Sequence, residues 1–192
     1  TVAVVIGIDP GHTGGIAVME PGGRVLRTYR MPITRGDRPS LDLMQLEYIL
    51  THQESHVTMA AIEQVRPQGN NNGAVGMAAM MRGIGQIEGL IFALRLSRQE
   101  VPPQSWQKLL VGVPHPRAPK GASEAEKARA RNLWKAEVVK AAQRRWPAVD
   151  LIASTHGSAK ESSGVADALW ICEFARLLQT AGAIQPLANT KG

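Results

Sequence analysis

The chain of 192 residues suits one domain of generous size, and 44% hydrophobic residues are enough for a globular core. It contains no run of about 18 apolar residues, which excludes a membrane-spanning helix of ordinary length. The net charge of +6 favours nucleic acid or another anionic partner, and the basic excess is concentrated in residues 117–145.

The N-terminal third predicts three strands. Residues 2–9 are a β-branched run that ends at the turn-forming pair Pro10-Gly11. Residues 14–19 are apolar, and residues 24–31 resume the strand pattern after a Gly-Gly turn signal. Because both connections have hairpin length, we expect an antiparallel meander.

The middle of the chain alternates helices and strands. Residues 41–50 have apolar side chains at helical spacing, with Ser40 as the expected N-cap. Residues 58–62 form a short apolar strand that delivers Glu63. Residues 74–95 are apolar nearly all round and rich in Gly, Ala and Met, which is typical of a helix that is buried on most sides or packed against a partner.

The C-terminal half predicts one more strand and three helices. The short strand is expected at residues 100–101. The three helices follow it at residues 105–111, 123–146 and 165–178. Ser123 and Glu126 form a capping box at the start of the second of these helices. Three hairpin strands followed by alternating helices and strands predict an α/β fold, a mixed five-stranded sheet with helices on both faces. We expect one domain over residues 1–180 and a flexible tail at 181–192.

Three acidic residues stand at the ends of predicted elements. Asp9 closes the first strand, Glu63 closes the fourth, and Asp167 lies in the first turn of the last predicted helix. Several carboxylates in one cleft are what a two-metal nuclease needs. Each acid also has a structural interpretation, as a turn former, a solvated strand end and a residue that favours the helix dipole, respectively. Spacing alone does not choose between these interpretations.

The residues around the acids resemble the motifs of RuvC-type Holliday junction resolvases. The matching words are IGIDPGHTGGIAV at residues 6–18, AIEQV at 61–65 and GVADAL at 164–169. The likeness continues more loosely through residues 105–112 and 120–127, so it covers most of the chain up to about Leu178. The GVAD pattern is closer to the phage-type branch of that family than to the cellular one.

The resemblance implies an RNase H-like fold, a homodimer, and symmetric nicking of four-way DNA junctions in recombination and repair. Mg²⁺ is the implied cofactor, with Mn²⁺ as a substitute. Asp9, Glu63 and Asp167 match the family's catalytic, metal-binding acids. The family usually has a fourth acid or a His three or four residues before the last aspartate, where this chain has Gly164 and Ser163. The Ser163 position or a displaced ligand, Glu161 or His156 in the predicted loop at 155–164, would complete the set.

Basic residues are the candidate DNA contacts. Lys120 and Lys127 resemble the family's basic DNA-contacting segment, and Lys108 joins them. Arg66 follows the Glu-Gln-Val word, where some members carry an aromatic residue, and opens a polar loop. A solvated helix face and an ordinary surface loop are the alternatives. The Gly- and Met-rich helix at 74–95 is interpreted as the dimer interface, because a two-fold DNA target suits a two-fold protein, with a core helix as the alternative.

Two other functions are compatible with parts of the sequence. A junction-binding protein that has lost a ligand would keep the fold without cutting DNA. An actin- or sugar-kinase-like ATPase shares the Asp-Pro-Gly-His-Thr word, but it needs a second such loop and a longer chain. The lone cysteine, Cys172, forms no internal disulfide, and no signal peptide is evident, so we expect a reducing, cytoplasmic location in a bacterial or phage-infected cell.

Overall fold

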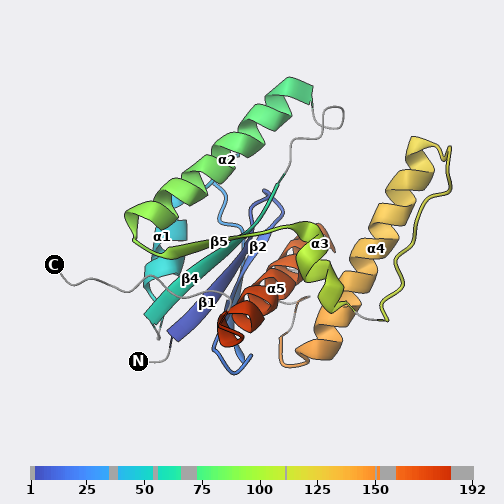
Figure 1. Ribbon diagram of the computed structural model, residues 1–192. Coiled ribbons are helices and arrows are strands. Elements are labelled where there is room, and N and C mark those ends of the chain that lie inside the picture. Colours follow the sequence, from blue (N-terminus) through green and yellow to red (C-terminus); the bar gives the residue numbers. More distant parts are fainter. Residues whose placement is uncertain are drawn as a thin grey trace.

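The computed structural model of the protein contains one mixed five-stranded sheet in the order β3-β2-β1-β4-β5 (Figure 1). It describes residues 3–34, 39–53, 56–65, 73–110, 112–149, 151 and 159–182, except the side chains of 73, 74 and 159–161. The strands are β1 (Ala3–Asp9), β2 (Gly15–Met19), β3 (Val25–Arg30), β4 (His56–Glu63) and β5 (Ser97–Val101). The first three form the predicted antiparallel meander, and β4 and β5 run parallel to β1.

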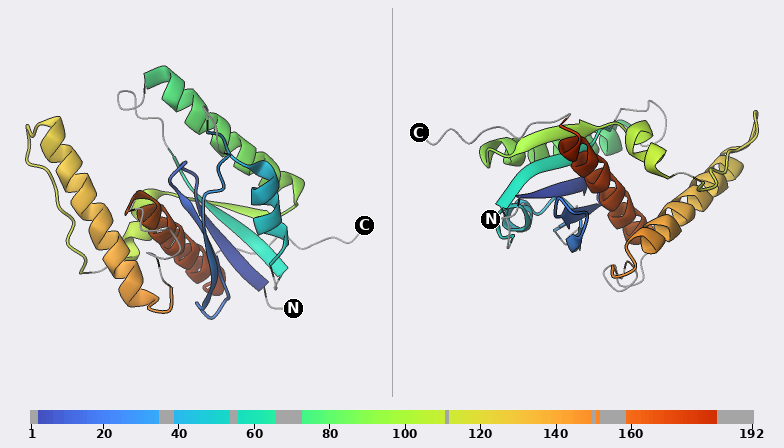
Figure 2. Two further views of the ribbon diagram at one scale, coloured as in Figure 1. Left: turned by 180° about the vertical axis from the view of Figure 1, so that it is seen from behind. Right: turned by 60° about the horizontal axis from the view of Figure 1, so that its bottom comes forward.

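Helices cover both faces of this sheet, as predicted. One face carries α1 (Leu43–Thr51) and α2 (Gly73–Ala93). The left view of Figure 2 shows the molecule from this side. The other face carries α5 (Ala159–Thr180), with the short α3 (Pro103–Trp106) and the 3-10 turn η1 (Gln107–Leu109) beside it. The long α4 (Glu124–Arg145) packs on α5 rather than on the sheet.

The strands divide their side chains between two hydrophobic clusters. In β1, Val4, Ile6 and Ile8 belong to the cluster under α1 and α2, whereas Val5 belongs to the cluster under α5. This alternation follows from the two-residue period of a strand whose two faces are both covered. The side chains of β1 are therefore apolar on both of its faces, and the continuous apolar run in the sequence predicts a buried strand.

The central helix α5 lies directly against the backbone of the sheet. A Cβ on Gly7 of β1 would stand 2.4 Å from the Ala168 carbonyl oxygen, so only glycine permits this approach. On α5, the buried Cys172 Sγ donates a hydrogen bond of 3.2 Å to the Val5 carbonyl oxygen. Burial raises the pKa of the Cys172 thiol well above its ordinary value. The part of α5 around Ala168 and Cys172 is therefore packed directly against β1.

Several predicted boundaries are wrong. The N-cap of α1 is Asp42, whose side chain accepts from the Gln45 backbone N–H, rather than Ser40. Strand β5 begins at Ser97 rather than at residue 100. Its parallel pairing with β4 includes charged residues, which are common in an edge strand and hide the strand pattern in the sequence. Helix α5 begins at Ala159 rather than at residue 165, since small polar residues that look like a loop are buried in it. Within the described residues, no helix is long and apolar enough to cross a membrane.

Candidate active site

The parallel pairing of β1 and β4 brings two of the three acids to one edge of the sheet. Ile8 pairs with Ile62, so Asp9 and Glu63 follow side by side where the two strands end. Asp167 approaches from α5, whose preceding turn contacts the β1–β2 connection through a bridge between Gly14 and Gly164. The bridge carries Asp167 to the same edge. Asp167 therefore lies two turns inside α5, not in its first turn as the sequence predicts.

The three carboxylates are close enough to repel one another. Burial and the charge of Asp9 raise the pKa of Glu63 to about 7. Burial also raises the pKa of Asp167 well above its ordinary value, and the charges of Asp9 and Glu63 add to that increase. The pKa of Asp9 is raised by burial as well. Like charges held together in a poorly solvated site favour either protons or a bound cation.

Lys135 is the basic residue that acts on this cluster. Its charge lowers the pKa of Asp9, Glu63 and Asp167, so it lies within electrostatic range of all three. It comes from α4, eight residues after Lys127. The sequence pattern places Lys135 in the basic segment without distinguishing it from its neighbours. Only the packing of α4 on α5 determines which of these charges reaches the acids.

Trp106 contacts the site by a direct hydrogen bond. Its indole Nε1–H donates to Glu63 Oε1 over 2.9 Å. The side chain is 2% exposed and lies in the hydrophobic cluster beneath α5. Sequence reasoning missed this residue, because the two partners lie 43 positions apart and nothing local links them. The available signal was general: a buried indole N–H usually has an acceptor.

The two positions before Asp167 that lack an acid differ in the structure. Gly164 is packed so tightly that a Cβ would lie 2.1 Å from the Thr13 carbonyl oxygen, so no side chain fits there. Ser163 lies one helical turn before Asp167 and is 2% exposed. Its hydroxyl has no hydrogen-bond partner among the described residues. His156 and the side chain of Glu161 lie outside the described residues.

The donor set suits a divalent cation chemically, although the side chains are not gathered around one point. Carboxylate oxygens are the ligands that Mg²⁺ and Mn²⁺ prefer, and the mutual repulsion of Asp9, Glu63 and Asp167 would be relieved by such an ion. No group of three or more His, Cys, Asp or Glu side chains in the described part of the chain is close enough to hold a metal ion as it stands. Metal binding would require these side chains to move toward one another.

The other basic candidates that the structure describes lie on η1 and around the start of α4. Lys108 is exposed on η1, and Lys120 is exposed just before α4. Lys127 is exposed in the first turn of α4 and forms an ion pair of 2.8 Å with Glu124. The capping box of Ser123 and Glu126 at the start of this helix is confirmed. Arg66 lies outside the described residues.

A cavity of about 320 Å³ lies between Glu63 and α2, on the side away from α5. Its polar wall carries Glu63, Glu88 and Glu100, and Arg98 forms ion pairs with the latter two. Asp9 and Asp167 do not line it. Because its charge is mainly negative, the cavity does not suit a phosphate group, so the acids rather than this cavity mark the candidate active site.

The sequence matches no family model and no curated protein. The fold, however, has solved counterparts. A structure of T. thermophilus RuvC in complex with Holliday junction substrate matches with a TM-score of 0.57 and 16% identity, over 96% of this chain and 99% of that chain. A second structure, of Thermus thermophilus RuvC, matches with a TM-score of 0.54 and 18% identity over the same shares. At such identity the likeness establishes the fold, and the protein therefore has the mixed five-stranded, RNase H-like architecture of RuvC.

Proposed function

We propose that this protein is a metal-dependent endonuclease that resolves four-way DNA junctions, and that its GVAD motif marks it as phage-type. One observation carries the proposal: Asp9, Glu63 and Asp167 lie within electrostatic range of one another at one edge of the sheet, in a fold similar to that of RuvC. The RuvC counterpart is a complex with Holliday junction substrate, which supports branched DNA as the substrate class.

The three acids would hold Mg²⁺, or Mn²⁺ in its place. When bound, the ion supplies activation of the attacking water and stabilisation of the charge that develops on the phosphate. The acids are half-buried at the site, so their negative charge is poorly screened by solvent and attracts the ion strongly. Lys135 would bind the phosphate beside them, because its charge already reaches all three acids.

A stripe on α4 leads to this site. Lys127, Arg131 and Lys135 follow at intervals of four residues, all three are exposed, and residues four apart lie on one side of a helix. Phosphate contacts by such residues supply most of the affinity for DNA and do not depend on sequence. We infer that one arm of the junction lies along α4, with Lys120 at its outer end and the scissile phosphate next to Lys135.

Helix α2 supports a dimer. Its solvent-facing side carries apolar and small residues at helical spacing, which are Val75, Ala78, Met81, Gly85, Gly89 and Phe92. Val75 and Phe92 are each 85% exposed, and Met81 is 40% exposed. Large apolar side chains exposed in one row mark an interaction surface, and the small residues between them let another helix approach closely. A second copy of the chain would cover this stripe and provide the second active site that symmetric nicking needs.

The test is cleavage of a labelled four-way junction in Mg²⁺, compared with a linear duplex of the same sequence. We expect paired nicks in the junction and none in the duplex, and no cleavage by Asp9→Asn, which should still bind the junction because Lys and Arg contacts dominate affinity. A protein that binds the junction without cutting it in Mg²⁺ or Mn²⁺ would instead be the non-catalytic junction binder, which Gly164 and Ser163 favour. ATP hydrolysis without junction binding would overturn both.

A further inference from the structure

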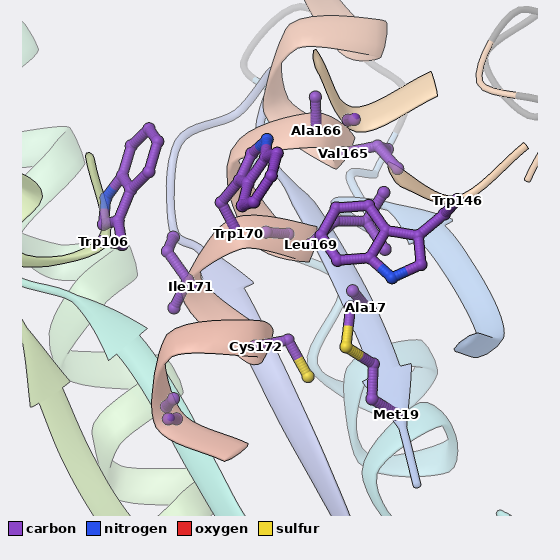
Figure 3. Close-up of a cluster of buried hydrophobic side chains, with 14 of the residues drawn as sticks. Ala17, Met19, Trp106, Trp146, Val165, Ala166, Leu169, Trp170, Ile171 and Cys172 are labelled. Carbon is purple, nitrogen blue, oxygen red and sulfur yellow. The ribbon is translucent and has the colours of Figure 1, made fainter. Parts of the chain in front are cut away.

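Three tryptophans are buried in the hydrophobic cluster on the α5 side of the sheet, and only one of them has a polar partner for its indole N–H in the described part of the chain. The Nε1 atoms of Trp146 and Trp170 are buried without an acceptor, and their rings pack together with centroids 4.8 Å apart. Trp106 belongs to the same cluster, and Figure 3 draws Trp170 between Trp106 and Trp146. Its N–H has an acceptor, the carboxylate of Glu63. This fold tolerates unpaired indoles, so the Trp106 bond is a specific feature of the site.

The backbone holds the two partners in a fixed relationship. Glu63 pairs with Val101 at the end of β5, and the Gln64 N–H donates to the Val101 carbonyl oxygen over 2.9 Å. Pro102 then caps α3, and Trp106 follows within a few residues. The strand that neighbours Glu63 therefore leads straight into the helix that carries its hydrogen-bond donor. With Trp106 2% exposed, close packing leaves its ring little room to turn away from Glu63.

A neutral donor has a particular advantage at this place. An arginine or lysine beside Glu63 would orient the carboxylate but would also compete with a cation for its charge. An indole N–H orients the carboxylate through Oε1 and leaves the full charge, and the second oxygen, available to a metal ion. Hydrogen bonds to ligating carboxylates are what set ligand orientation in metal sites.

We propose that Trp106 is a positioning residue for Glu63, whose indole N–H holds the carboxylate in the orientation in which it binds a divalent cation. The inference rests on the proposed function only in assigning Glu63 to the metal. It adds to the three acids a neutral side chain that touches no DNA and no metal but determines how strongly the metal binds.

The test compares Trp106→Phe with Trp170→Phe, its matched control. Both changes remove one buried indole N–H from the same cluster, but only the first leaves a carboxylate without its donor. Mn²⁺ affinity of the full chain is measured by the electron paramagnetic resonance signal of free Mn²⁺, without DNA. We expect Trp106→Phe to weaken Mn²⁺ binding about tenfold, within the usual range for such partners, and Trp170→Phe to leave it unchanged. Saturating Mn²⁺ should restore junction cleavage by Trp106→Phe.

Equal Mn²⁺ affinity of Trp106→Phe and the wild type overturns the inference. The proposed function fails separately, if the wild type binds Mn²⁺ but leaves junctions uncut. Should Trp106→Phe not fold, the unaltered protein still gives an answer by ¹H–¹⁵N spectroscopy of its four indole N–H groups. Three are assigned by Phe substitution at Trp134, Trp146 and Trp170. The remaining resonance should move most on adding Mg²⁺, and an unmoved Trp106 signal contradicts the proposal.

Discussion

Gly14 and Gly164 touch backbone to backbone where α5 meets the turn between β1 and β2, paired as a parallel bridge. The contact brings Asp167 to Asp9 and at the same time excludes any side chain three residues before Asp167. One of the two positions at which a fourth ligand is expected is therefore occupied by a structural contact, so a fourth ligand has to come from the Ser163 position or from elsewhere.

Gly164→Ala should destabilise the protein by about 1–3 kcal/mol, because the new Cβ would lie 2.1 Å from a backbone oxygen that cannot move independently. Gly83→Ala is the control: its Cβ meets nothing within 4 Å, and alanine in a helix interior should add roughly 0.5–1 kcal/mol of stability. Urea denaturation of both variants measures the two effects. A Gly164→Ala variant as stable as the wild type would mean that α5 can shift away from the turn.

Asp9→Asn should make the metal-free protein more stable and abolish its stabilisation by metal. The charge of Asp9 raises the pKa of both Glu63 and Asp167, so removing it relieves repulsion in the folded state. A cation that binds only the folded wild type raises its melting temperature. Thermal melts with EDTA and with Mg²⁺ test both effects, with the exposed Glu47→Gln as a control for loss of one negative charge. Equal Mg²⁺ stabilisation of Asp9→Asn and wild type would remove Asp9 from the metal site.

Neutralising Lys120 and Lys127 together to Gln should weaken junction binding and flatten its salt dependence. Each phosphate that the protein no longer neutralises lowers the slope of log K against log salt by about 0.9. The control is a double variant of Arg24 and Lys140 to Gln, which changes the net charge equally. Arg24 lies in the turn between β2 and β3, and Lys140 lies on another side of α4. Binding titrations at several salt concentrations measure the slope for both double variants. An unchanged slope for the Lys120 and Lys127 variant would place the DNA elsewhere.

Met81→Glu should convert a dimer into monomers, because a charge buried in an apolar interface without a partner costs several kcal/mol. Met81 lies in the middle of the α2 stripe, whereas Met44 on α1 is 84% exposed and serves as the control site for the same substitution. Sedimentation velocity distinguishes the two species. If Met81→Glu remains dimeric and folded, the interface lies away from this stripe.

Ser163→Asp should increase Mg²⁺-dependent cleavage, because a carboxylate one turn before Asp167 offers the charge that the hydroxyl lacks. Burial predicts a second effect: at 2% exposure, the new charge should destabilise the protein in EDTA and be compensated by Mg²⁺. Cleavage rates and melts in parallel measure the two effects. If Ser163→Asp has no effect on cutting while Glu161→Gln abolishes it, Glu161 is the fourth ligand.

The sequence predicts those parts of the fold and the site that depend on local pattern. Asp9 and Glu63 stand at the ends of apolar runs, and parallel pairing makes such ends neighbours, so their meeting follows from the strand pattern. The hydrogen bond of Trp106 and the electrostatic effect of Lys135 on the acids could not be predicted, because both depend on how α3 and α4 pack on α5. The start of α5 is mispredicted for a related reason: Ser162 and Ser163 look like loop residues and are buried by tertiary contacts.

The burial of Cys172 makes this protein a ready background for site-specific labelling. The thiol is the only one in the chain, it is fully enclosed, and its raised pKa keeps it from the thiolate form that reacts with maleimides and disulfides. A single cysteine introduced at an exposed position would therefore carry a dye or a cross-linker alone. Placed on the α2 stripe it would test the proposed dimer by the distance between two copies, and placed on α4 it would test the proposed approach of DNA, without replacing any native residue of the core.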